Sequence, residues 1–199
     1  KPLLQWTIDQ AKDSKLINKI AVSSDNQEIQ NLSARKRMII IERPAEISGD
    51  DATSESAIIH AIKKLIFKPD LIVFLQPTSP LRHSSDIDNA INELIKNDYD
   101  SLFSACEIED FLIWERYMDG QLHSINYDYN NRQRRQEIEK KYVENGSIYV
   151  FKPEILLKHN NRLGGKIGMY IMDKWKMHEI DDYESLEICE FIMKKNYFK

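Results

Sequence analysis

Short apolar runs alternate with amphipathic stretches along most of the chain, and this alternation predicts strands and helices in turn. Strands are expected at residues 17–23, 38–41, 70–75, 101–106, 147–151 and 169–172. Apolar side chains recur at helical spacing in residues 2–14, 25–35, 57–65 and 87–95, and again in a last helix at residues 186–192. This order of elements is typical of an α/β fold with a mostly parallel sheet.

The apolar run at residues 70–75 ends in a polar loop, residues 76–82. Such an uninterrupted run suits a central strand that is buried on both faces, and ligands of parallel sheets bind beyond the carboxyl ends of the strands. Two prolines restrict the loop, and the hydroxyls of Thr78 and Ser79 can donate or accept hydrogen bonds. The loop therefore predicts a polar binding site, although an ordinary strand-to-helix turn with a serine as the helix N-cap explains it equally well.

The alternating pattern breaks between residues 107 and 141, where aromatic side chains lie among charged ones without a clear period. A segment of this length without a strand or helix is uncommon in a compact domain, unless it is functional or packs on another subunit. We therefore expect an α/β core made of residues 1–106 and 142–199. The insertion between them is expected to form a homodimer.

Composition narrows the class of protein. The 199 residues are 42% hydrophobic and 30% charged, enough for one domain with a real core. No apolar stretch approaches 18 residues, so no membrane span is expected, and the net charge of −4 argues against nucleic acid as the main partner. The two cysteines form no disulfide framework, which favours the cytoplasm, and the histidines lack the spacing of zinc ligands.

Two carboxylates near the end of the chain are the strongest local signal for chemistry. In an extended segment, Glu179 and Asp181 project from the same face, where they repel each other unless a cation lies between them. Carboxylate oxygens together with phosphate oxygens are the ligands that Mg²⁺ prefers. The alternative is that Asp181 or Asp182 caps the last helix and Glu179 is a solvated side chain.

Positive charge gathers shortly before the strand at residues 147–151. Three arginines at positions 132, 134 and 135 precede Gln136, and Asn145 and Gly146 lead into the strand. Guanidinium groups match phosphates and carboxylates, so the cluster could bind an anionic sugar or a polyphosphate. A solvated loop balanced by nearby glutamates, followed by a hairpin turn at Asn145 and Gly146, is the alternative.

Taken together, these stretches resemble the CMP-sialic acid synthetases, also called acylneuraminate cytidylyltransferases. The similarity lies in LQPTSPLR (residues 75–82), RRQ (residues 134–136), Tyr142 with ENGSIY (residues 144–149), EID (residues 179–181) and RPAE (residues 43–46). The resemblance implies a Rossmann-like three-layer nucleotidyltransferase fold and a homodimer with a swapped cap. It also implies the transfer of CMP from CTP to a nonulosonic acid, with Mg²⁺ as the cofactor and pyrophosphate as the second product.

The resemblance also assigns roles to single residues. It implies nucleotide contacts at Arg43, Gln76 and Ser79, contacts to sugar or phosphate at Arg135 and Asn145, and magnesium-side acids at Glu179 and Asp181. The catalytic residues would then be Asp181, Glu179 and Arg135. One of the two carboxylates would accept the proton of the sugar hydroxyl, and the sequence leaves open which one.

The chain departs from the family pattern at three places. Many relatives have Asp where this chain has Glu179, and many bacterial members have Arg at the position of Val143. The family begins with a strand and a phosphate-holding loop, and residues 1–3 match the segment just after that loop, so we expect the 199-residue chain alone to be catalytically silent.

Two rival interpretations stay open. A Kdo cytidylyltransferase would carry a carboxylate in the loop after the central strand, where this chain has Pro77 to Pro80. A non-catalytic module that binds a sugar or a nucleotide is the other.

Overall fold

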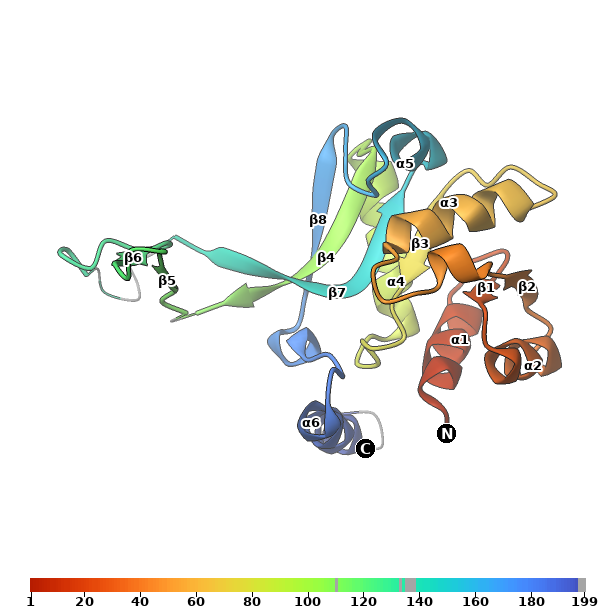
Figure 1. Cartoon of the computed structure of the whole chain (residues 1–199), viewed down its shortest axis with the longest axis horizontal. Coiled ribbons are helices and arrows are strands. Elements are labelled where there is room, and N and C mark those ends of the chain that lie inside the picture. Colours follow the sequence, from red (N-terminus) through yellow and green to blue (C-terminus); the bar gives the residue numbers. More distant parts are fainter. Residues whose placement is uncertain (110, 133, 135–138, 197–199) are drawn as a thin grey trace.

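The computed structural model describes residues 1–109, 111–132, 134 and 139–196. A four-stranded sheet lies at its centre, in the order β3-β7-β4-β8 (Figure 1). Its strands are β3 (Ile72–Leu75), β4 (Ser101–Ile108), β7 (Lys141–Phe151) and β8 (Ile167–Met172). Strands β3, β4 and β8 run in one direction and β7 in the other. A separate parallel pair is formed by β1 (Ala21–Ser24) and β2 (Ile39–Glu42).

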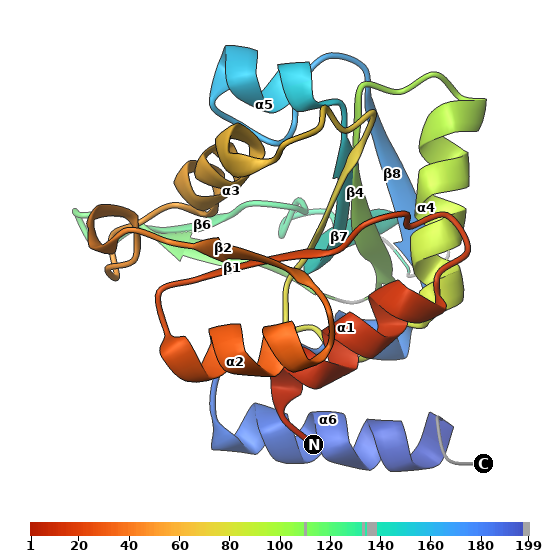
Figure 2. The ribbon, with the colours of Figure 1, turned by 90° about the vertical axis from the view of Figure 1, so that its right-hand side faces the viewer.

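Helices cover both faces of the sheet and make three layers (Figure 2). Helix α4 (Ser84–Lys96) packs on one face, where its apolar side chains meet Ile148 and Val150 of β7. Helices α3 (Ser54–Lys64) and α5 (Pro153–His159) lie over the other face, where Tyr149 and Phe151 point. The alternation of β7 between the two clusters is the period of two that a strand imposes.

The position of β3 corrects one expectation. We expected a central strand buried on both faces, but β3 is an edge strand of the four-stranded sheet and all four of its residues are only partly buried. Val73 and Leu75 pack on the α4 side, and Ile72 and Phe74 pack on the α3 side. Both faces are thus apolar because helices cover them, and an apolar run alone does not tell a central strand from such an edge strand.

Strand β7 begins earlier than expected, and it carries an irregularity that shapes the site. Its register against β4 shifts between Phe103 and Ala105, so the segment around Asn145 and Gly146 forms a β-bulge. Gly146 has φ +61° there. The two residues therefore lie inside a strand, and the alternative of a hairpin turn at this position is wrong.

The insertion projects from the core as an arm on the long strands β4 and β7 (Figure 1). It was expected to lack strands and helices, but β5 (Trp114–Arg116) and β6 (Leu122–Ser124) pair as a short antiparallel hairpin. Three-residue strands are too short to show a period in the sequence.

The remaining helices lie around this core. Helices α1 (Leu3–Asp13) and α2 (Gln27–Arg35) lie beside β1 and β2, and η1 (Ala45–Ile47) follows β2. The 3₁₀ turn η3 (Lys174–Met177) follows β8, and α6 (Tyr183–Asn196) packs through Cys189 and Met193 against Leu81. No helix in the described part of the chain is long and apolar enough to cross a membrane.

Candidate active site

The loop after β3 is held from below by a buried arginine. Arg82 is fully buried, and its guanidinium donates hydrogen bonds to the carbonyl oxygens of Ser79 (2.7 Å) and Gln76 (2.8 Å). It also donates to the carbonyl oxygen (3.0 Å) and Oγ (3.1 Å) of Ser147 and to Oγ1 of Thr7 (2.9 Å). The shape of the loop thus depends on Arg82 as well as on the two prolines, and this guanidinium belongs to the scaffold.

The bulge in β7 brings a glycine against a carboxylate. A Cβ atom on Gly146 would lie 2.5 Å from Oε1 of Glu179 and 2.9 Å from Oε1 of Gln76. Only glycine allows this close approach together with a positive φ. Gln76, Gly146 and Glu179, which are far apart in the sequence, therefore meet at the end of β3.

Asn145, next to this glycine, is directed into the protein. Its side chain is 2% exposed, its Nδ2 donates to the carbonyl oxygen of Lys176 (3.1 Å), and its Oδ1 accepts from Oγ of Ser104 (2.6 Å). These bonds connect β7 to β4 and to η3. The contact of Asn145 with a sugar or phosphate stays a prediction.

The segment that carries the two carboxylates is attached to the loop. The backbone N–H of Ile180 donates to the carbonyl oxygen of Thr78 (2.8 Å). Burial raises the pKa of Glu179, the negative charge of Asp181 raises it further, and the hydroxyl of Ser79 acts in the opposite direction. The charge of Asp181 thus acts on the carboxylate of Glu179. That the two side chains hold a cation between them stays a prediction.

The open question of the helix cap is settled by Asp182. This residue directly precedes α6, and its Oδ1 accepts a hydrogen bond from the backbone N–H of Ser185 (2.7 Å). Asp181 is exposed beside it.

A third carboxylate adds to the negative charge of the site. Glu144 accepts a hydrogen bond from the hydroxyl of Tyr149, and its charge also raises the pKa of Glu179. Among the described residues, no three His, Cys, Asp or Glu side chains are placed to hold a metal ion together.

The two arginines of the predicted site differ in what the structure shows. Arg43 follows β2, and its Nη2 donates to the carbonyl oxygen of Ser23 (2.6 Å) at the end of β1. Arg135 lies outside the described residues. The structure thus brings Gln76, Ser79 and Glu179 together. Asp181 follows two residues after Glu179 and is exposed, and Arg43 lies at the end of the neighbouring β1–β2 pair.

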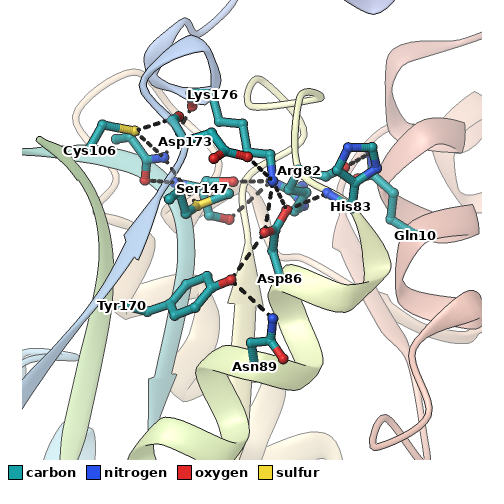
Figure 3. A network of polar contacts seen from close by, with 12 residues as sticks. Gln10, Arg82, His83, Asp86, Asn89, Cys106, Ser147, Tyr170, Asp173 and Lys176 are labelled. Atoms are coloured by element: carbon teal, nitrogen blue, oxygen red, sulfur yellow. Dashed lines mark hydrogen bonds and ion pairs between the residues drawn. The ribbon is translucent and has the colours of Figure 1, made fainter. Parts of the chain in front are cut away.

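Sequence reasoning missed a buried ion pair next to this site. Nζ of Lys176 lies 2.9 Å from both carboxylate oxygens of Asp86, and the two side chains are 5% and 6% exposed (Figure 3). The partners are 90 residues apart. No local pattern in the sequence connects them.

Comparisons with known proteins identify the family of the chain. A family model described as cytidylyltransferase matches residues 1–198. The N-acylneuraminate cytidylyltransferase A of Danio rerio is 31% identical over 183 residues, which are 90% of this chain and 42% of that protein, so the chain spans less than half of that relative's length. The pseudaminic acid cytidylyltransferase of Campylobacter jejuni is 24% identical over 99% of this chain and 87% of its own length.

A solved structure shares the fold. The CMP:2-keto-3-deoxy-manno-octonic acid synthetase in complex with CTP superposes with a TM-score of 0.71, over 98% of this chain and 88% of that one. The two sequences are 13% identical. This likeness shows the Rossmann-like nucleotidyltransferase fold.

Proposed function

Because the chain belongs to the cytidylyltransferase family, whose model matches residues 1–198, we propose that it transfers CMP from CTP to the anomeric hydroxyl of a nonulosonic acid. The sugar oxygen attacks the α-phosphorus of CTP, the bond to the β-phosphate breaks, and pyrophosphate leaves. The relatives support this class of sugar, since their names give N-acylneuraminate and pseudaminic acid as the groups that they activate.

One observation carries the proposal: the carboxylate of Glu179 lies beside the loop after β3 and against Gly146, and the charge of Asp181, two residues further on, acts on it. Two negative charges at this place suit a reaction in which a cation must be bound together with phosphate oxygens. One of the two carboxylates would also accept the proton of the sugar hydroxyl.

Mg²⁺ is the cofactor that fits these residues. Glu179 and Asp181 would hold it, and it would neutralise charge on the phosphate oxygens of CTP. The mutual repulsion of the two carboxylates supports a cation at this place, and the lack of a third suitable protein ligand among the described residues supports coordination that is completed by phosphate and water.

The other expected contacts complete the proposal. Arg43, Gln76 and Ser79 would contact the nucleotide, and Asn145 and Arg135 the sugar or phosphate. The arm would pack on a second copy and bring Arg135 to the rim of that copy's site. The two cysteines are free and buried, in keeping with a cytoplasmic location.

The test is a direct assay of the full-length protein. We expect CTP, Mg²⁺ and a nonulosonic acid to yield a CMP-sugar and pyrophosphate in equal amounts. The formation of both products is monitored by ³¹P NMR. N-acetylneuraminic acid, pseudaminic acid and Kdo are supplied in parallel. A preference for Kdo would favour the rival enzyme, and no product from any of the three acids would contradict the proposal.

A matched variant controls for changes of charge near the site. Asp182→Asn removes one charge next to Asp181 but keeps a side chain that caps α6 well. We expect this variant to retain the activity of the wild type.

A further inference from the structure

The carboxylate of Asp86 is fixed from several sides at the start of α4. It accepts a hydrogen bond from the backbone N–H of His83 (2.6 Å), one from the hydroxyl of Tyr170 (3.2 Å) and two from Nζ of Lys176 (Figure 3). Asp86 thus offers Lys176 a binding place that is itself held by a helix end and by β8.

Lys176 connects two layers of the molecule. Its side chain reaches Asp86 in α4, while its carbonyl oxygen accepts the hydrogen bond from Nδ2 of Asn145 in β7. Asp173, an exposed residue at the start of the same turn, lies 3.4 Å from the ammonium group. The turn η3 is therefore tied to α4 through a side chain and to the bulge of β7 through the backbone.

The next fixed point along the chain lies beyond Glu179. The N–H of Ile180 is bound to the carbonyl oxygen of Thr78, so the segment from Lys176 to Ile180 is held at both ends. Glu179 lies between these two points, three residues after Lys176, and its carboxylate rests against Gly146. A shift of Lys176 would be transmitted to Glu179 over three residues of chain.

Stability alone does not explain such a pair. A buried ion pair pays a large desolvation penalty, and apolar side chains of similar volume often stabilise a protein as well or better. A buried charged pair instead fixes the position of the segment that carries it, because the ammonium group of Lys176 can bind its acceptors only at one place.

We propose that the Lys176–Asp86 ion pair is a positioning device that sets the place of Glu179 and Asp181 relative to Gly146 and the loop after β3. This inference rests on the proposed function, because the positions of Glu179 and Asp181 matter for turnover only if these residues take part in the transfer of CMP. Lys176 is a positioning residue, since it acts through the segment that it anchors. Its loss should therefore change turnover and the demand for Mg²⁺, and leave the affinity for CTP almost unchanged.

The first test compares Lys176→Met and Lys176→Arg in the full-length protein. We expect Lys176→Met to lower kcat by about tenfold or more and to raise the Mg²⁺ concentration for half-maximal rate, with KM for CTP within about twofold of the wild type. Lys176→Arg should restore most of kcat, because it keeps the charge and the donors. Lys174→Met, which removes an exposed lysine of the same turn, should behave as the wild type.

A second readout does not depend on catalysis. Amide hydrogen exchange of the metal-free protein should show faster exchange at Ile180 and Gly146 in Lys176→Met, and unchanged exchange in Lys174→Met. Should Lys176→Met fail to fold, Asp86→Asn serves in its place, with the same expected changes.

The outcomes separate the two proposals. A folded Lys176→Met with the kcat, Mg²⁺ demand and exchange of the wild type would overturn the positioning role, as would a lower melting temperature with normal kcat per folded molecule. If the wild type makes no CMP-sugar from any acid, the proposed function fails, and the exchange comparison still decides the inference.

Discussion

Glu179 owes its surroundings to three separate parts of the chain. The loop after β3 places Gln76 and Ser79 near it, the bulge of β7 places Gly146 against its carboxylate, and its own segment places Asp181 beside it. The half-buried carboxylate is thus kept close to another negative charge, an arrangement that costs stability and that a bound cation would relieve.

Removing either charge should slow the reaction strongly while leaving the fold intact. We expect Glu179→Gln and Asp181→Asn each to reduce kcat by about a hundredfold or more, because the cation loses a ligand while packing is unchanged. Steady-state rates at saturating Mg²⁺ measure the effect, and melting temperatures equal to or above that of the wild type confirm the fold. Near-normal rates in both variants would refute the assignment.

The contact of Gly146 with Glu179 can be tested by one methyl group. Gly146→Ala should reduce kcat strongly, because its Cβ would displace the carboxylate of Glu179. Gly120→Ala is a matched control, since Gly120 also has a positive φ (+84°) but no atom lies within 4 Å of the place that its added methyl group would take. Both variants should lose about 1 kcal/mol of stability from backbone strain. Equal activity of the two variants would show that the contact is irrelevant to turnover.

At the scale of the elements, the sequence predicts local features well and pairings poorly. The amphipathic spacing of Ile87, Ala90, Ile91 and Leu94 locates α4, because one helix face meets one apolar cluster. The order of strands in a sheet depends on contacts between distant segments, so β3 was expected in the middle of the sheet and lies at an edge. Helix α5 escaped notice, since its seven residues are too few to establish a period.

Helices α1 and α4 are joined by a carboxylate whose effect depends on pH. Asp88 of α4 accepts hydrogen bonds from Oγ of Ser14 (2.5 Å) and from the backbone N–H groups of Lys15 (3.1 Å) and Leu16 (3.2 Å), just after α1. Burial alone would raise the pKa of Asp88, but these hydrogen bonds hold it below its usual range.

Asp88→Asn should therefore destabilise the protein at neutral pH and matter less in acid. A lowered pKa in the folded state contributes stability above the ordinary aspartate pKa, and this stability is lost as the pH falls through the lowered value. We expect a loss of about 1 kcal/mol at pH 7, or about 2–4 °C in melting temperature. Calorimetry at several pH values measures it, with Asp50→Asn in an exposed loop as the control. A difference that stays constant down to low pH would contradict this account.

At the scale of the whole molecule, only those parts of the site can be predicted whose residues are close together in the sequence. Glu179 and Asp181 stand two residues apart, so the sequence alone predicts that their charges interact. The packing of α4, β7 and η3 pairs Lys176 with Asp86 and buries Arg82. The residues next to them in the sequence do not predict either feature. Long-range packing thus decides which charged residues are buried in the scaffold and which stay accessible.

The exposed apolar surface of the arm has no explanation within a single chain. Its described part exposes many large apolar side chains, namely Phe111, Ile113, Trp114, Tyr117, Met118, Leu122, Ile125 and Tyr129. Trp114 packs against the rings of Tyr127 and Tyr129, with ring centroids 5.8 and 5.4 Å apart, so the hairpin has a definite shape. An apolar surface on a projecting element is typical of a protein–protein contact.

We therefore predict a homodimer in which each arm packs on the partner with two-fold symmetry. Light scattering at tens of micromolar should give twice the mass of one chain. Replacing both Leu122 and Ile125 by Asp should yield monomers, because the contact would bury unpaired charges. Ile66→Asp is the matched control. Ile66 is fully exposed on the surface of the α/β part of the chain, outside the arm, and its variant should stay dimeric. A monomeric wild type, or a dimer that survives the double substitution, would show that the arm serves another purpose.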